Sequence, residues 1–336
     1  MSYLLKRYDG SPFDKLRTNG SVVPSCKGTD HGELVEPCDI QMPETQKKTS
    51  HLLEYIALKL LQIILTLLPR TIALKVGAAT GYLLYATGMY RTIVRKNLDL
   101  VNLWSVQESA AITRNLYRNM GRYAIDFLRI AKTRPVYRTH NFETIETLRK
   151  QGRGIIVLLA HFGNWEILAD LFGSRVKDLY VVAKPMKNPL VDEWLSKKRD
   201  AASVTTIYME KALRRIYAAL TGNHLVAVLI DQRAGGGQGT LSPFLGKETA
   251  TVRTVAGLVH KTGCGVMPTY AIMQKDGSYD IVISSATPPN ITGKSEDECI
   301  SAIQAQHNEI IGSWIKQYPE HWFGWFHKRF KEYVRY

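Results

Sequence analysis

Two patterns of apolar and polar positions occur along residues 151–336, and stretches with one pattern alternate with stretches that have the other. Short continuous apolar runs predict buried β-strands, whereas apolar residues three or four positions apart predict amphipathic helices. This alternation is typical of an α/β fold in which helices flank a central, largely parallel sheet. The predicted strands are 154–160, 179–183, 225–230, 265–272 and 279–284, and the predicted helices are 164–173, 189–202, 210–221, 249–263 and 297–317.

The hydrophobic pattern before residue 91 is different. Residues 51–69 form an apolar run about as long as a membrane-spanning helix, interrupted by Glu54, Lys59 and Gln62. A spanning anchor, a helix lying in the membrane interface and a buried core helix all fit this pattern. A second apolar segment, 76–90, is too short to span, so we expect it to pack against the first or to enter the interface.

Residues 1–45 are rich in Gly, Pro, Ser, Thr and Asp and lack a sustained apolar period, which predicts disorder without a cleavable signal peptide. We interpret this segment as an accidental extension, with the working start near Met42, in preference to a functional tail. The predicted organisation is an extension (1–45), membrane-associating hydrophobic helices (46–90) and an α/β domain (91–336).

Charge adds a preference for anionic partners. The chain has 336 residues, with 44 Lys and Arg against 30 Asp and Glu. Phosphates of nucleic acid, anionic lipid and an acidic protein all fit this excess. Residues 70–150 alone contain 14 basic and five acidic residues. There, Arg114, Arg118 and Arg122 recur every four residues along a predicted helix, and we expect this stripe to face lipid phosphates or solvent.

The segment AHFGNWE (160–166) is the first candidate for chemistry. His161 follows a buried strand, and Glu166 stands where the next helix begins. On one helix, five residues turn through about 500°, so the two side chains could meet only across a strand–turn–helix junction. Gly163 permits such a turn and Asn164 is a candidate helix cap. An imidazole deprotonates a hydroxyl and a carboxylate fixes its tautomer, although a structural pair would have the same spacing.

Three further segments contain candidate site residues. LIDQRAGGGQG (229–239) places Asp231 at another strand end, before a glycine-rich loop that lacks the Gly-Lys-Ser/Thr of a phosphate-binding P-loop. In 243–268, Thr249 is a candidate cap for the helix that follows. EHWFGWFHKRFKEY (320–333) interleaves aromatic and basic residues, which fits nucleic-acid stacking, a lipid interface or a packed core.

Absent motifs narrow the chemistry. The sequence has no GxSxG and no HExxH, so acyl transfer would proceed without a serine nucleophile. Its four cysteines show no CxxC spacing and no clustering with histidine, so neither a zinc site nor a disulfide framework is indicated.

Taken together, these motifs resemble the bacterial lipid A late (lauroyl/myristoyl) acyltransferases, within the glycerolipid acyltransferases that share a His-x4-Asp/Glu motif. The similarity runs in unbroken order from about residue 50 to 331. The matching segments are RKNLDL (95–100), AHFGNWE (160–166), AKPMKNPLVDEWLSKKR (183–199), DQRAGGG (231–237), PFLGKETATVRT (243–254) and HWFGWFHKRFK (321–331).

The resemblance implies an acyltransferase domain over 91–336 in which His161 and Glu166 form the catalytic pair. Lys184 replaces an arginine found in many members, which keeps the charge but loses bidentate geometry. The residues that the resemblance assigns to the substrate cleft are Lys184, Asn188, Arg199, Asp231, Gln232 and Arg233.

The family transfers a fatty acyl chain from acyl carrier protein to a hydroxyl of a lipid A precursor, without metal or cofactor, at the cytoplasmic face of the inner membrane. Acyl-CoA is the alternative donor. Relatives acylate other glycolipids, such as mannosylated phosphatidylinositol, so the acceptor remains open. We therefore expect an acyl carrier protein or acyl-CoA donor, a glycolipid acceptor and inner-membrane lipid as partners, and no nucleic acid. The competing hypothesis is a non-catalytic basic protein that binds anionic lipid or nucleic acid.

Overall fold

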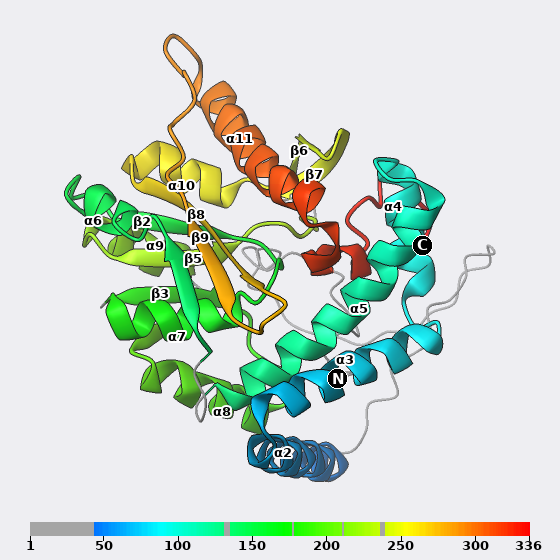
Figure 1. The fold of residues 1–336 in the computed structure, drawn as a ribbon. Helices are drawn as coiled ribbons and strands as arrows, with labels where there is room; N and C mark the ends of the chain where they lie inside the picture. The colour runs from blue at the N-terminus through cyan, green and yellow to red at the C-terminus, as the bar shows by residue number, and fades with distance from the viewer. Residues whose placement is uncertain (1–43, 131–134, 177, 210–211, 236–238) are drawn as a thin grey trace, which may run out of the picture.

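The computed structural model describes residues 44–130, 135–176, 178–209, 212–235 and 239–336 (Figure 1). The predicted disordered extension thus lies, up to residue 43, outside the described residues, as does part of the glycine-rich loop. The described helices are α2 (Glu44–Leu67), α3 (Arg70–Ala86), α4 (Arg91–Val101), α5 (Val106–Arg129), α6 (Thr144–Arg149), α7 (Glu166–Arg175), α8 (Pro189–Ala201), α9 (Ala212–Thr221), α10 (Thr254–Thr262) and α11 (Glu296–Gln317).

The central sheet has seven strands in the order β1-β9-β8-β2-β5-β3-β4. The five from β8 to β4 run parallel, whereas β9 is antiparallel to β8 and β1 follows the direction of β9. The strand bounds are β1 (Tyr137–His140), β2 (Ile155–Leu159), β3 (Leu179–Ala183), β4 (Val204–Tyr208), β5 (Leu225–Leu229), β8 (Gly265–Met273) and β9 (Tyr279–Ile283). The predicted α/β class, with helices flanking a largely parallel sheet, is confirmed.

The strands that were predicted are those buried in the middle of the sheet. All five residues of β2 are buried, as expected for a strand covered on both faces. Two flanking strands were not predicted: β1 and β4 lie at the two sheet edges and are short, with burial alternating or incomplete. Their apolar signal is therefore weak.

The helix predicted over 249–263 is wrong at its beginning. Residues Lys247–Val252 form strand β7, which pairs with β6 (Gly239–Phe244) in a separate hairpin, and α10 begins only at Thr254. Thr249 is therefore a strand residue and no helix cap. The alternating residues Thr249 and Thr251 are fully buried, which is the period of a strand and not of a helix. Asn164 does not cap α7 with its side chain either, because that side chain donates to the hydroxyl of Tyr279.

Helices α3 and α5 lie side by side next to the sheet domain (Figure 1). Their backbones touch at glycines: a Cβ added to Gly77 would lie 2.6 Å from the carbonyl oxygen of Gly121. Helix α2 contacts α3 through Leu65 and Ala73, which share a small buried cluster with Ile125 of α5. Ala73 precedes the second apolar segment, so the expected packing of 76–90 against the first segment stays a prediction.

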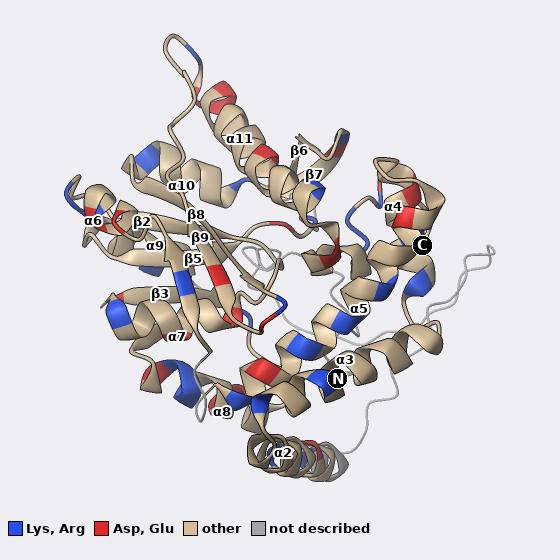
Figure 2. Cartoon of the chain, viewed as in Figure 1, with Lys and Arg blue, Asp and Glu red and all other residues tan. Residues whose placement is uncertain are grey.

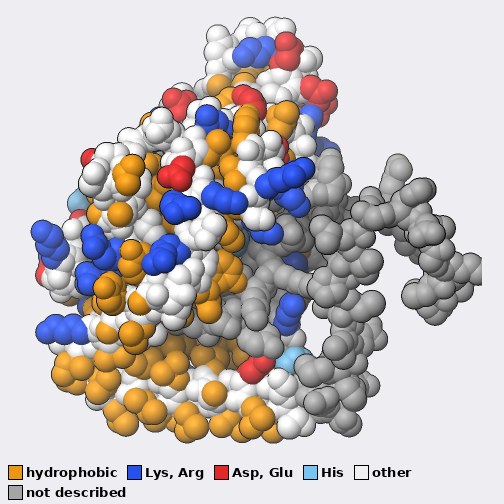
Figure 3. Space-filling model, turned by 90° about the vertical axis from the view of Figure 1, so that its right-hand side faces the viewer, with side chains coloured by type: hydrophobic (Ala, Val, Ile, Leu, Met, Phe, Trp, Pro, Cys, Tyr) orange, Lys and Arg blue, Asp and Glu red, His pale blue; other side chains and the backbone are white. Residues whose placement is uncertain are grey.

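Helix α2 runs along one edge of the molecule, at the bottom of Figure 1. Within it, Lys48–Leu67 is long and apolar enough to cross a membrane, and only 6% of its most apolar window is buried. Figure 3 shows hydrophobic side chains gathered along this lower edge, with Lys and Arg side chains above them. The core-helix alternative for residues 51–69 is therefore wrong, and the spanning and interfacial alternatives both remain.

Candidate active site

His161 and Asp231 lie opposite each other at the carboxyl edge of the sheet. Strands β2 and β5 are parallel neighbours whose register pairs Leu159 with Leu229. His161 stands two positions after Leu159, and Asp231 stands two positions after Leu229. Both side chains therefore lie at the same point of the sheet edge. This edge is where open α/β sheets usually bind ligands.

The contact between these residues is a two-point hydrogen bond. Nδ1 of His161 lies 2.9 Å from Oδ1 of Asp231, and the backbone N–H of His161 donates to Oδ2 at 3.0 Å. The indole Nε1–H of Trp322 also donates to Oδ2, at 2.8 Å. Asp231 is 1% exposed, and burial by itself would raise its pKa. The His161 ring and these hydrogen bonds nevertheless hold the pKa of Asp231 at about 2.

The turn after β2 is fixed by backbone contacts. Gly163 has a φ of +61°, and a Cβ there would lie 2.0 Å from the carbonyl oxygen of Ala271. Its N–H donates to the carbonyl oxygen of His321 at 2.8 Å, and Phe323 N–H donates to that of His161 at 2.7 Å. The predicted glycine turn therefore anchors His161 against both β8 and the C-terminal segment.

Because Nδ1 of His161 is engaged by Asp231, Nε2 is the nitrogen available for proton transfer. Around the ring stand Trp165, edge-on with centroids 5.0 Å apart, and the amide of Gln232, whose Nε2 is 3.4 Å from Nε2 of His161. The same amide nitrogen is 3.4 Å from Nε2 of His327. Two imidazoles, with centroids 6.1 Å apart, thus face one polar amide.

His327 was not singled out from the sequence, where it stood in a segment interpreted only by its charge and aromatic content. Burial lowers its pKa to about 4, with a further lowering by His161 and an opposing effect of Asp231. At neutral pH His327 is therefore an uncharged imidazole. Asn97 of α4 holds its backbone carbonyl with a 2.9 Å hydrogen bond.

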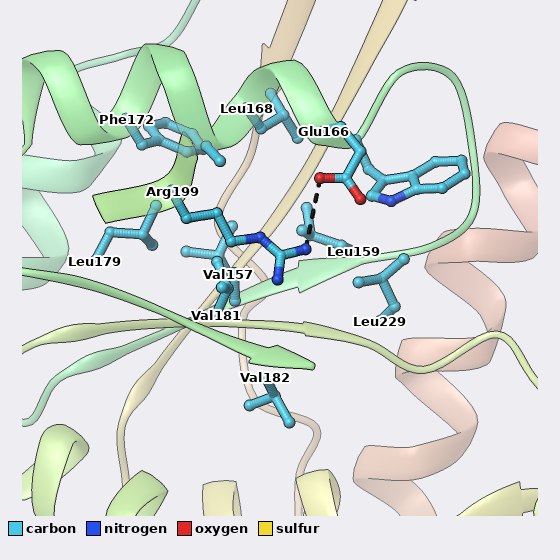
Figure 4. Close-up of a pocket in the computed structure, with 13 residues that line it drawn as sticks. Val157, Leu159, Glu166, Leu168, Phe172, Leu179, Val181, Val182, Arg199 and Leu229 are labelled. Carbon is cyan, nitrogen blue, oxygen red and sulfur yellow. Dashed lines mark ion pairs between the residues drawn. The ribbon is translucent and has the colours of Figure 1, made fainter. Parts of the chain in front are cut away.

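Glu166 does not hydrogen-bond to His161, contrary to the predicted pairing. It is the first residue of α7, and its Oε2 lies 3.7 Å from Nη2 of Arg199, which comes from α8 (Figure 4). The carboxylate bonded to His161 is Asp231. The cause is topological: the neighbouring strand supplies a carboxylate in register, whereas the first turn of α7 directs its side chain toward α8. The catalytic role predicted for Glu166 and the substrate-cleft role predicted for Asp231 both stay predictions.

Glu166 and Arg199 line one end of an apolar pocket of about 50 Å³ between α7 and the sheet. Figure 4 shows apolar side chains from β2, β3, β5 and α7 around the ion pair. The apolar lining residues include Val157, Leu159, Leu168, Phe172, Leu179, Val181, Val182 and Leu229. Arg199, predicted to lie in the cleft, is therefore beside Glu166 with its side chain 15% exposed.

Three other predicted cleft residues, Lys184, Gln232 and Arg233, lie at or near the same sheet edge. Lys184 is exposed and directly follows β3, the neighbour of β5, so it stands at the same sheet edge as His161. Gln232 touches both imidazoles. Arg233 is near them in sequence, but its Nε pairs with Glu332 at 2.8 Å.

Asn188, also predicted to line the substrate cleft, lies at the beginning of α8. Its side chain accepts from the N–H of Leu190 as the N-cap of α8, and donates to the carbonyl oxygen of His51 and to Oε2 of Glu54. Its polar atoms are thus used to fix α8 and to join it to α2. The side chain thus links two helices in the structure, and its predicted contact with substrate stays a prediction.

The C-terminal aromatic segment belongs to the core: Trp322, Trp325 and Phe330 are fully buried. The packed-core alternative for this segment is therefore confirmed. Buried with them, Arg329 donates to the carbonyl oxygens of Gln232 and Ala250. The segment thus forms the wall that holds Asp231 and the residue after it.

Among the described residues, no three His, Cys, Asp or Glu side chains gather closely enough to hold a metal ion. The polar groups at the sheet edge instead form a base with an oriented proton, next to a hydrocarbon-lined pocket. Such an arrangement fits the deprotonation of a hydroxyl beside an apolar group.

No curated protein matches this sequence. The family described as bacterial lipid A biosynthesis acyltransferase matches residues 42–332, which is most of the chain. The matched range includes the sheet-edge residues His161, Asp231 and His327 and the membrane-compatible helix α2. The protein is therefore an acyltransferase that belongs to the bacterial lipid A biosynthesis acyltransferase family.

Proposed function

We propose that the chain transfers a fatty acyl group from a thioester donor, acyl carrier protein, to a hydroxyl of a lipid A precursor at the cytoplasmic face of the inner membrane. The observation that carries this proposal is the His161–Asp231 pair at the sheet edge, in a chain that belongs to an acyltransferase family. Support for the membrane location comes from exposed α2, and support for an acidic carrier protein comes from the excess of basic residues.

His161 is the proposed general base. As the acceptor oxygen forms its bond to the thioester carbonyl carbon, the hydroxyl proton passes to Nε2 of His161. Asp231, bonded to Nδ1, keeps this tautomer and stabilises the imidazolium. When the tetrahedral intermediate collapses, the C–S bond breaks and the leaving thiolate takes the proton from His161. No serine or cysteine nucleophile is needed, so no acyl-enzyme should accumulate.

Glu166 has an electrostatic role in this proposal. It neutralises Arg199 beside the apolar pocket, where an unpaired guanidinium would be costly. The acyl chain of the donor would enter between α7 and the sheet. Because the pocket holds only about 50 Å³, its apolar walls must separate to admit a fatty chain. Lys184, exposed at the same edge, is the proposed contact for phosphates of the donor or acceptor.

The test is a product analysis. Purified protein is incubated with acyl carrier protein thioesters or acyl-CoA and with a panel of glycolipids that includes a lipid A precursor and mannosylated phosphatidylinositol. We expect the lipid A precursor to gain the mass of one acyl group, with acyl carrier protein as the better donor.

His161→Ala should remove this product. Acylation of the phosphatidylinositol mannoside alone would replace the proposed acceptor. Binding of anionic lipid without any acyl transfer would favour the non-catalytic alternative. A stoichiometric acyl-protein formed without acceptor would contradict direct transfer.

A further inference from the structure

The packing of α3 on α5 leaves a hollow on the surface, away from the sheet edge that holds His161. Its volume is about 300 Å³. The helices approach closely because Gly77 and Gly81 of α3 face α5. The neighbouring alanines have short side chains that do not fill the surface beside this contact. The lining residues are Ala78, Ala79 and Tyr82 from α3 and Arg118 and Arg122 from α5.

The hollow is strongly positive. Arg118 and Arg122 are exposed and stand one helical turn apart, so both guanidinium groups lie on the same side of α5. Figure 2 shows basic residues recurring along this helix beside α3. Within the described part of the chain, neither arginine forms an ion pair with a carboxylate. Like charges at this spacing repel each other, so a bound anion would relieve the repulsion.

One of the two guanidinium groups is held in place. The Cζ atom of Arg118 lies 5.1 Å from the centroid of the Tyr82 ring, within the range of a cation–π contact. This contact restricts a long side chain before any ligand arrives. Guanidinium groups bind phosphate through paired N–H donors, so two of them at one hollow form a site suited to that anion.

The surroundings of the hollow are apolar. Along α3, Ile72, Val76 and Leu83 recur at intervals of four and seven residues and are 47%, 41% and 65% exposed. They form one outward stripe beside the hollow, on the helix that follows the exposed apolar helix α2. A phosphate held by the two arginines would therefore lie next to an unpartnered hydrocarbon-like surface, as a lipid headgroup lies next to its acyl chains.

We propose that this hollow is a binding site for the phosphate of an anionic membrane phospholipid. A nucleic acid or a soluble phosphate fits the two arginines but not the adjacent exposed stripe, whereas a lipid satisfies both. The site is distinct from the acyl-transfer residues, since none of its lining residues touches His161, Asp231 or Gln232. A lipid bound there would hold α3 and α5 at a defined depth in the membrane interface, while the substrates bind at the sheet edge.

The experiment measures binding of the full chain to vesicles of phosphatidylcholine with and without phosphatidylglycerol, with no acyl donor present. Arg118→Gln/Arg122→Gln is compared with Arg214→Gln/Arg215→Gln, which removes the same charge from two exposed positions on α9. A basic residue near an anionic surface contributes about fivefold to binding, so the first pair should weaken binding to phosphatidylglycerol vesicles about 10- to 30-fold. The α9 pair should have little effect. Thermal unfolding checks that each variant is folded.

A second variant tests the role of the ring. Tyr82→Ala should weaken phosphatidylglycerol binding a few-fold, and Tyr82→Phe should restore it, because the aromatic face and not the hydroxyl orients Arg118. Equal losses for the α5 and α9 pairs would show that only overall charge matters and would overturn the site.

Two further outcomes would also contradict the proposal. The first is soluble glycerol phosphate competing as well as the lipid does. The second is unchanged vesicle binding in the α5 pair together with lost acylation in uncharged detergent micelles, which would assign the hollow to the acceptor. Because binding is measured without turnover, a wrong assignment of donor or acceptor would leave the result interpretable.

Discussion

The carboxyl edge of the sheet and the α2–α3 edge are built in opposite ways. At the sheet edge, Asp231 is 1% exposed, and each oxygen of its carboxylate accepts at least one hydrogen bond from protein. Along α2, by contrast, Leu53, Ile64 and Leu67 are more than half exposed and have little protein to pack against. The described residues therefore form a rigid polar corner around His161 and Asp231, whose hydrogen bonds are made within the protein. They leave the apolar edge along α2 largely uncovered.

The largest expected effect lies in the rigid corner. His161→Ala should lower the acyl-transfer rate by on the order of 10²–10⁴-fold, because it removes the proposed general base. Steady-state kinetics under saturating donor would measure it, and circular dichroism would check that the fold survives, since this side chain is 22% exposed and does not fill a core. A fully active variant would show that the corner is only structural.

The apolar edge should respond to a change that leaves the corner intact. Leu60→Ser/Ile64→Ser removes two side chains that are 55% and 58% exposed on α2. Transfer of each from water to hydrocarbon is worth about 1.5–3 kcal/mol, so membrane recovery should fall by about 10-fold or more.

Sedimentation of membranes from cells that express the variant measures this loss. Leu213→Ser, which changes a side chain that is 46% exposed on α9, is the control and should stay membrane-bound. Unchanged recovery of the α2 variant would show that this surface is covered by something other than lipid.

A smaller effect is expected at the second imidazole. His327→Ala should reduce kcat by roughly 10-fold, which is less than the loss of about 10²–10⁴-fold expected for a general base, because its ring contacts the amide of Gln232. His327→Gln keeps a donor and should recover part of the rate. If both variants match the wild type in kcat and in the pH profile of kcat, the contact through Gln232 has no role in turnover.

Three histidines whose pKa is lowered by burial should make the folding stability of the protein fall at acidic pH. Burial lowers the pKa of His307, His321 and His327 to about 4 each. In the unfolded chain these groups titrate near 6.5, so the unfolded state binds more protons as the pH falls from about 6.5 toward 4. Stability present above pH 6.5 is thus lost across that window, by up to roughly 10 kcal/mol in total, since each of the three rings titrates about 2.5 pH units lower in the folded chain and one pH unit corresponds to about 1.4 kcal/mol.

Urea unfolding at pH 7.5 and pH 5 measures this loss. His307→Leu should flatten the pH dependence, whereas the same change at exposed His140 should leave it unaltered. A stability that does not fall between the two pH values would show that these rings are protonated without penalty in the folded protein.

Local sequence patterns predicted only part of these two regions. The central strands and the positions of His161 and Asp231 at strand ends follow from continuous apolar runs. Their pairing with each other does not, because it depends on β2 and β5 being neighbours in the sheet, which no local pattern encodes. Glu166 was paired with His161 because the two are close in sequence, whereas the structure turns it toward Arg199. Edge strands and hairpin β6–β7 were missed because half-buried polar strands give little hydrophobic signal.

The central claim is that Asp231, and not Glu166, works as one unit with His161. A double-mutant cycle tests it directly, with rates measured for His161→Ala, Asp231→Asn and Glu166→Gln alone and for the two doubles that contain His161→Ala. Residues that act together show strongly non-additive losses. Our account predicts that Asp231→Asn costs almost nothing further once His161 is gone, whereas Glu166→Gln keeps most of its own effect. The reverse result, with Glu166 silent and Asp231 additive in the His161→Ala background, would contradict it.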